Sequence, residues 1–179
     1  MAKKIVYVDM DNVLVDFPSA FDNVDPRLLE AYKGDEDEIP HIFSKMEPVK
    51  GAIEAFTYLS EHFDTYILST APWENPTAWS EKLEWVKEHL GKVAYKRLIL
   101  THHKNLNVGD FLIDDRPNNG AEDFTGELIR FGGDEFPDWD SVSHLYEKAY
   151  WINVQKKSIW TPLRTIDIHV DSQGNRTYF

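Results

Sequence analysis

The residues with the clearest chemical potential are two aspartates, one residue apart, near the start of the chain. Asp9 and Asp11 follow the apolar and mostly β-branched run Ile5–Val8. Such a run is typical of a buried parallel strand, and open parallel sheets bind ligands at the carboxyl ends of their strands. Two neighbouring carboxylates repel each other unless a cation neutralises them or one keeps a proton. The pair is therefore either a solvated turn or a phosphoryl-transfer centre that combines a nucleophile with an acid.

Further polar groups follow other expected strands in the same way. Taken singly, each has a structural explanation: Thr70 could cap a helix or sit in a turn, and Lys104 could be a surface lysine. Taken together they match the needs of phosphoryl transfer: a nucleophile, a metal held by oxygens, donors for the phosphoryl oxygens and an acid for the leaving group. Mg²⁺ keeps several waters, so two or three carboxylates suffice to bind it. The set is Asp9, Asp11, Thr70, Lys104, Asp114 and Asp115.

The composition limits the classes of function. The chain has 179 residues, of which 42% are hydrophobic, and this suits one domain with a packed core. Its net charge is −12, which disfavours duplex nucleic acid as a partner. There is no cysteine for disulfides, thiol catalysis or Cys-ligated zinc. Neither a signal peptide nor an apolar stretch of about 18 residues is visible, so we expect a soluble cytoplasmic protein without a membrane partner.

Strands alternate with helices through most of the chain, which predicts an α/β fold with a doubly wound parallel sheet. After the first strand, we expect strands at 64–68, 97–100, 111–113 and 127–131. Helices are expected at 52–62, from 77 to Gly91, and at 140–150. The second of these helices has Trp79, Leu83, Val86 and Leu90 at helical spacing, and we expect this face to be buried.

Two segments interrupt or extend this pattern. Residues 17–46 are acidic and rich in proline, and we interpret them as a small helical cap with helices at 26–32 and 37–46. The catalytic core then comprises 1–16 and 47–152. Residues 153–179 read as a β-hairpin extension, because an alternating segment at 165–170 and a second at 176–179 flank a turn signal. The hairpin could be an added edge, a dimer contact or a lid, so a homodimer is one of the alternatives.

In these motifs the sequence resembles a known family. Asp-Met-Asp-Asn-Val-Leu at 9–14, then Thr70, Lys104 and Ile-Asp-Asp at 113–115 match, in order, the four signatures of the haloacid dehalogenase superfamily. The longer segments at 8–17, 100–104 and 112–117 are similar to those of the 5′(3′)-deoxyribonucleotidases. The resemblance covers about residues 4–140. It departs from the family pattern at Asn12, where glycine is commoner, and at Ala71, where a second hydroxyl is frequent.

The resemblance implies roles for the acidic residues. Asp9 would be the nucleophile that forms an aspartyl-phosphate. Asp11 would protonate the leaving nucleoside oxygen and later deprotonate the hydrolytic water. Mg²⁺ would bind Asp9, the main-chain carbonyl of Asp11, and Asp114. Asp115 would orient Lys104 or a metal-bound water.

The resemblance also implies a binding site for a nucleotide. Thr70 and Lys104 would hold the phosphoryl oxygens, and Arg116 is assigned to substrate binding with them. Phe17 occupies the position where the family places an aromatic ring near the base. Trp73 follows Thr70 in a proline-flanked loop at the same edge, where it could also border the base.

We therefore expect a Mg²⁺-dependent phosphatase that acts on nucleoside monophosphates. One alternative is the same chemistry on another small ester, such as a sugar phosphate; the aromatic residues of the cap favour a base. Another is a catalytically silent binding module with the same fold. The intact Asp9, Asp11, Lys104 and Asp114 speak against this module, which has no need of a nucleophile beside a metal.

Overall fold

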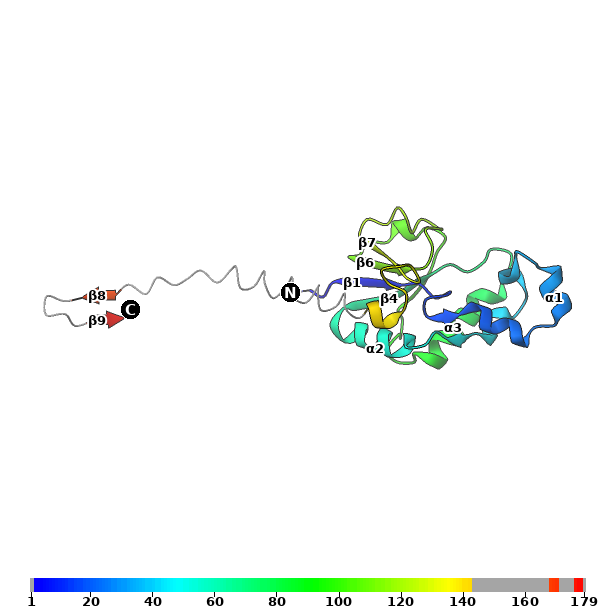
Figure 1. Ribbon diagram of the computed structural model, residues 1–179, viewed down its shortest axis with the longest axis horizontal. Helices are drawn as coiled ribbons and strands as arrows, with labels where there is room; N and C mark the ends of the chain where they lie inside the picture. The colour runs from blue at the N-terminus through cyan, green and yellow to red at the C-terminus, as the bar shows by residue number, and fades with distance from the viewer. Residues whose placement is uncertain (1, 143–167, 171–175, 179) are drawn as a thin grey trace. The chain divides into compact units, whose positions relative to one another are not determined.

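The main sheet of the protein has five parallel strands. We describe a computed structural model, which covers residues 2–142, 168–170 and 176–178. The strand order is β5-β4-β1-β6-β7, and Figure 1 labels β4, β1, β6 and β7 side by side in this order. The predicted α/β parallel sheet is confirmed, and the four later strands begin and end within one residue of their predicted positions. The strands are β1 (Ile5–Val8), β4 (Asp64–Ser69), β5 (Leu98–Leu100), β6 (Phe111–Asp114) and β7 (Glu127–Arg130).

The central strand β1 lies where the strand order reverses. Tyr7 in β1 is in register with Tyr66 in β4 on one side and with Leu112 in β6 on the other. The chain first builds outward through β4 and β5, and then returns to build β6 and β7 on the opposite side. Open α/β sheets bind ligands at such a switch point, beyond the carboxyl ends of the strands. The ends of β1, β4 and β6 therefore meet where a site is expected.

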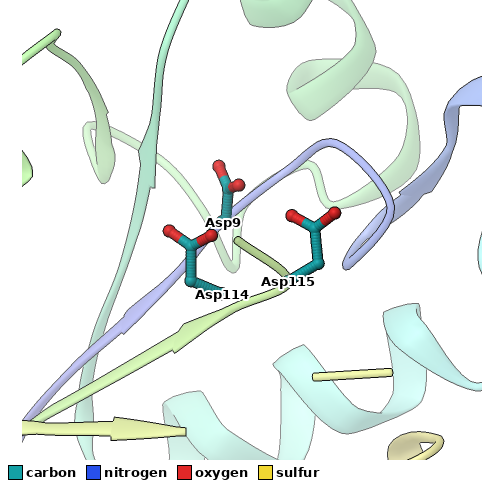
Figure 2. Close-up of side chains that lie close together, drawn as sticks. All are labelled: Asp9, Asp114 and Asp115. Atoms are coloured by element: carbon teal, nitrogen blue, oxygen red, sulfur yellow. The ribbon is translucent and has the colours of Figure 1, made fainter. Parts of the chain in front are cut away.

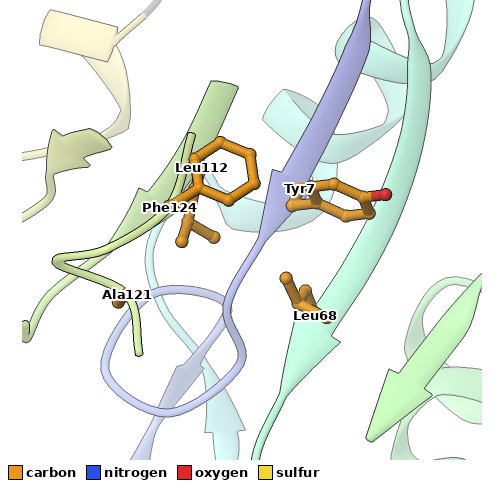
Figure 3. Packing of buried hydrophobic residues seen from close by; sticks show 5 residues of the cluster. All are labelled: Tyr7, Leu68, Leu112, Ala121 and Phe124. Atoms are coloured by element: carbon orange, nitrogen blue, oxygen red, sulfur yellow. The ribbon is translucent and has the colours of Figure 1, made fainter. Parts of the chain in front are cut away.

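One face of the sheet is covered by a core that is centred on Tyr7. Its ring meets the ring of Phe124 edge to face, with 5.9 Å between the centroids, and its hydroxyl donates to the carbonyl of Val108 at 3.0 Å. A Cβ at Gly109 would come within 2.5 Å of the same ring, so this position requires glycine. The cluster, shown in Figure 3, consists of Tyr7, Leu68, Leu112, Ala121 and Phe124.

The two long helices are α2 (Ala52–His62), which packs against β4, and α3 (Thr77–His89), which packs against β5. The apolar face predicted for α3 is wrong in part, because Trp79 and Leu83 are each 41% exposed. The buried side chains of α3 are Ala78, Glu81, Lys82, Trp85 and Val86. This face carries two charged residues because it packs against the cap as well as the sheet.

The cap is joined to the core by a short antiparallel ribbon of β2 (Val15–Asp16) and β3 (Glu47–Pro48). The predicted helix at 37–46 is wrong. Pro40 has no amide hydrogen to donate, and His41 adopts a left-handed φ of 64°, so the segment divides into two short 3-10 helices. Between the ribbon strands lie η1 (Phe17–Asn23), α1 (Pro26–Ala31), η2 (Glu36–Glu38) and η3 (Ile42–Lys45).

Hydrogen bonds tie the cap to α3 and to the loop before it, and Figure 1 shows the cap in blue beside this helix. The side-chain amide of Asn75 donates to the carbonyls of Asp37 at 2.9 Å and Ile39 at 3.0 Å. The indole of Trp85 donates to the carbonyl of Met46 at 2.9 Å. The cap is thus held by buried polar contacts, which are costly to break.

The chain divides into two compact units, Met1–Ser143 and His144–Phe179. In the second unit, β8 (Ile168–Val170) pairs antiparallel with β9 (Arg176–Tyr178), which confirms the predicted hairpin; its role stays a prediction. Of the helix predicted at 140–150, residues up to 142 are helical, and the rest lies outside the described residues. So does the predicted boundary at 152. None of the helices in the described ranges has the length and apolar character needed to cross a membrane.

A buried hydrogen bond from Trp139 stabilises the loop that follows β1. The Trp139 side chain is 3% exposed, packs on Phe131, and donates from Nε1 to the carbonyl of Val13 at 2.9 Å. Trp139→Phe should lower the free energy of unfolding by about 1–3 kcal/mol, because it leaves a buried carbonyl unpaired. The matched control is Trp79→Phe on the exposed face of α3, where we expect a change within about 0.5 kcal/mol. Urea unfolding measures both, and equal losses would contradict the role of the hydrogen bond.

Candidate active site

Three carboxylates gather at the carboxyl ends of β1 and β6 (Figure 2). Asp9 directly follows β1, Asp114 ends β6, and Asp115 comes next. One oxygen from each lies within 4.8 Å of the others. Asp9 and Asp114 are buried, and Oδ1 of Asp9 and of Asp115 are buried without a hydrogen-bond partner in the described part of the chain. Buried carboxylate oxygens without partners are what a divalent cation would satisfy, so the residues fit a metal site.

Lys104 already neutralises part of this cluster. Its buried ammonium lies 3.1 Å from Oδ2 of Asp9 and 2.5 Å from Oδ2 of Asp114. Burial opposes the charge of Lys104, but the two carboxylates outweigh this effect and raise the pKa of the lysine. Burial and the charge of Asp9 raise the pKa of Asp114 to about 6, against the opposing influence of Lys104. Asp114 therefore changes its charge close to neutral pH unless a further cation is bound.

The contacts of Asp115 differ from those of its neighbour. Its Oδ2 accepts from the side-chain amide of Asn12 at 3.3 Å and lies 3.6 Å from Nε of Arg116. Asn12 has a φ of 58°, a left-handed conformation that asparagine tolerates better than most residues, and this explains an asparagine where the family more often has glycine. The structure does not place Asp115 on Lys104, and its action on a metal-bound water stays a prediction.

Asp11 is held by a residue that sequence reasoning missed. Nζ of Lys82 lies 2.8 Å from Oδ1 and 2.7 Å from Oδ2 of Asp11. Burial raises the pKa of Asp11, and the charge of Lys82 opposes this rise. A signal for Lys82 was present, because Ala78, Lys82 and Trp85 share one helical stripe. The prediction instead followed the stripe of larger apolar residues, Trp79, Leu83, Val86 and Leu90, because its helical spacing was clearer.

The structure brings most of the predicted site residues to one small pocket. Thr70 follows β4, and its hydroxyl donates to the carbonyl of Thr101 at 2.8 Å. The main-chain carbonyl of Asn119, a residue that was not predicted, accepts from the main-chain amide of Lys104 at 2.8 Å and so holds the backbone of the lysine in place. The pocket is lined by Asp9, Asp11, Thr70, Lys104, Asp114, Arg116, Asn118 and Asn119.

The two aromatic candidates, Phe17 and Trp73, are not among the residues that line this pocket. Phe17, at the start of the cap, is half-buried and packs on Phe21 and Phe43 with ring centroids 5.5 and 5.6 Å away. Trp73 is 77% exposed and meets the ring of His102 at 5.8 Å. Their contact with a base therefore stays a prediction.

Comparison with known proteins gives concordant matches. The sequence model of the family described as "5' nucleotidase, deoxy (Pyrimidine), cytosolic type C protein" matches residues 37–156. A relative from Vibrio phage KVP40, named "Putative 5'(3')-deoxyribonucleotidase", is 61% identical over 140 residues, covering 78% of this chain and 82% of its own. A protein of the same name from Bordetella pertussis is 36% identical over 138 residues, and the match covers 63% of this chain and 74% of that protein.

Solved structures bear on the fold alone, because their sequences are only 12% identical to this one. A haloacid dehalogenase-type hydrolase from Bacillus subtilis, crystallised with magnesium, has a TM-score of 0.50 and covers 77% of this chain and 90% of its own. A haloacid dehalogenase-like protein from Streptococcus pneumoniae also has a TM-score of 0.50, and the match covers 83% of this chain and 98% of that protein. With the family model spanning more than half of its length, the chain belongs to the family of 5′-nucleotidases, deoxy (pyrimidine), cytosolic type C.

Proposed function

We propose that the protein is a Mg²⁺-dependent phosphatase that hydrolyses nucleoside monophosphates, as a 5′(3′)-deoxyribonucleotidase. The observation that carries this proposal is the placing of Asp9, Asp114 and Lys104 together at the switch point of the sheet. The family and the names of the relatives support the nucleotide as substrate. A cytoplasmic location and a homodimer stay predictions.

Asp9 and Asp114, which the resemblance implies as ligands, would hold the metal, and the clustering of their oxygens with those of Asp115 adds this residue to the proposed ligands. Their clustered oxygens, two of them buried without a partner among the described residues, are the hard donors that Mg²⁺ prefers. The main-chain carbonyl of Asp11 is a further predicted ligand. When bound, Mg²⁺ would neutralise negative charge on the carboxylates and the phosphate.

Asp9 is the proposed nucleophile. One carboxylate oxygen attacks phosphorus, a bond to the nucleoside oxygen breaks, and Asp9 becomes an aspartyl-phosphate. Water then attacks phosphorus, which releases inorganic phosphate and restores the carboxylate. Lys104 lies against Asp9 and can stabilise the negative charge of the transferring group, and Thr70 and Arg116 border the same space.

Asp11 is the proposed general acid and base. The departing nucleoside oxygen needs a proton, and the protonated carboxyl of Asp11 can supply it. The raised pKa of Asp11, caused by burial, favours the form that carries this proton. In the second step, the carboxylate takes a proton from the attacking water, so the proton count closes over the cycle.

The cap supports a base over a sugar as the group attached to the phosphate. Phe17 begins the cap one residue after the ribbon strand β2, and it packs with Phe21 and Phe43 in one aromatic cluster. An aromatic base stacks on such rings better than a sugar does. A sugar phosphatase remains the alternative, and substrate screening separates the two.

Asp9→Asn should abolish hydrolysis while the protein stays folded, because a neutral amide cannot attack phosphorus and binds metal poorly. The measurement is release of inorganic phosphate from deoxynucleoside monophosphates, with circular dichroism to check the fold. Asp110→Asn is a suitable control, since its carboxylate accepts from the amide of Ile5 at the opposite end of β1. Near wild-type turnover by folded Asp9→Asn would eliminate the covalent mechanism.

Mg²⁺ should raise the melting temperature at pH 7.5, and chelation should stop turnover. The pKa of Asp114 is raised from its ordinary value of 3.8 to about 6, so its ionised form costs stability in full above pH 6, and the cost declines as the pH falls from 6 toward 3.8. Protons then compete with the metal, so the apparent Mg²⁺ affinity should fall by up to roughly tenfold per pH unit below 6. Thermal unfolding between pH 5 and 8, with and without Mg²⁺, measures this. A Mg²⁺ effect that is independent of pH, or equal in Asp114→Asn, would contradict the assignment.

Phe17→Ala should raise KM for nucleotides several-fold or more, because stacking of a base on an aromatic ring is worth roughly 1–3 kcal/mol. Hydrolysis of an aryl phosphate without a base should change little. Phe21→Ala is the matched control, since it removes a ring from the same cluster. Parallel losses on both substrates would argue for a packing role of Phe17 and would favour the sugar-phosphate alternative.

A further inference from the structure

The proposed mechanism gives no role to Lys82, a fully buried lysine on α3. Lys82 is 0% exposed, and its ammonium contacts both carboxylate oxygens of Asp11 and the hydroxyl of Ser69 at 3.1 Å. It also lies 4.6 Å from the centre of the Phe43 ring. Moving an ammonium out of water costs several kcal/mol unless its partners compensate. Here the partners come from three separate parts of the fold: the loop after β1, the end of β4, and the cap.

The position of Lys82 separates its task from that of Lys104. These are the two buried lysines in the described part of the chain. Lys104 lines the small pocket with Asp9 and Asp114, whereas Lys82 is not part of that lining. Lys104 is therefore the lysine placed to meet a phosphoryl group. Lys82 reaches the pocket through Asp11, which does line it.

The two contacts with Asp11 restrict the position of its carboxylate. The ammonium lies 2.8 Å from one oxygen and 2.7 Å from the other, so displacement of the carboxylate away from the lysine would lengthen both charge-assisted bonds. A general acid has to be aligned with the leaving oxygen, and small errors in placement are costly to the rate. Ser69 from the sheet and Phe43 from the cap hold the ammonium from other directions.

We propose that Lys82 is a positioning residue that orients Asp11 toward the leaving group, with Phe43 of the cap keeping the ammonium in place. This inference rests on the proposed role of Asp11 as general acid. The cap would then contribute to catalysis as well as to binding, since the ring of Phe43 also packs on Phe17, the expected contact of the base. Lys82→Met tests it, because methionine keeps an unbranched apolar stem but has no charge.

The experiment compares steady-state rates on phosphate esters that range from activated aryl phosphates to alkyl phosphates and deoxynucleotides. Lys82→Met should lower kcat on the order of 10²-fold for the poor leaving groups, approaching the loss caused by Asp11→Asn. Activated aryl phosphates, which leave with little help, should lose far less, and KM should change little. Lys82→Arg should recover part of the rate. The matched control, exposed Lys87→Met on the same helix, should leave all rates unchanged.

A double variant keeps the test valid if Lys82→Met unfolds because Asp11 is left unpaired. Asp11→Asn with Lys82→Met removes both charges, and the proposal expects its rate to match that of Asp11→Asn alone. An additional loss in the double variant, a uniform loss on every ester, or a rise in KM would overturn the proposal, because Lys82 would then act on the phosphate directly. Wild-type activity on aryl and alkyl phosphates without activity on nucleotides would overturn only the nucleotide assignment. Wild-type inactivity on every ester would overturn both proposals.

Discussion

Neutralisation of carboxylates at one edge of the sheet is the constraint that shapes the rest of the molecule. The ends of β1 and β6 bring four acids to the switch point, where burial makes their mutual repulsion expensive. Two buried lysines neutralise part of this negative charge: Lys104, which follows β5, and Lys82, which lies on α3. Lys104 lies between Asp9 and Asp114, and Lys82 holds Asp11. The division leaves Oδ1 of Asp9 and of Asp115 without a hydrogen-bond partner among the described residues, and these oxygens would be available to the proposed metal.

The same division would separate two kinds of chemistry in the proposed reaction. The proposed nucleophile, Asp9, has to be charged and close to the proposed metal, whereas the proposed acid, Asp11, has to carry a proton. Asp9 pairs with Lys104 and Asp11 pairs with Lys82, so the two carboxylates have different surroundings. Asn12, which directly follows Asp11, adopts a left-handed conformation and reaches Asp115 with its side chain. The short loop after β1 can therefore direct two acids that are one residue apart to different partners.

Helix α3 links the sheet, the cap and the site. It packs on β5, holds the cap through bonds such as that of Trp85 to Met46, and supplies Lys82 to Asp11. Its buried face consequently contains Glu81 next to the buried Lys82. Oε1 of Glu81 lies 2.7 Å from Nδ1 of His41 in the cap. An ordinary amphipathic helix would bury apolar residues there. The two large side chains that it exposes instead, Trp79 and Leu83, follow from this choice of face.

The sequence by itself determined the sheet and the part of the site that grows directly from it. Short apolar runs identified the strands, and parallel strands necessarily bring their carboxyl ends to a common edge. Asp9, Thr70, Lys104 and Asp114 could thus be placed together before the structure was known, since each lies at the end of a strand or within a few residues after it. The bounds of α2 could also be predicted, because one apolar stripe and one packing partner suffice for it.

Only the tertiary structure decided which residues meet across long separations. Lys82 and Asp11 lie 71 positions apart, and their contact depends on the angle at which α3 crosses the sheet and cap. Local periodicity cannot supply this angle, so it placed Trp79 and Leu83 on the buried face as well as Val86 and Leu90, and only the last two are buried. At the break after Pro40, the left-handed residue His41 also makes a contact over a long separation, because its amide donates to the hydroxyl of Thr77 on α3. Local pattern determines which segments form strands, whereas the pairing of buried charges depends on contacts that exist only after the chain has folded.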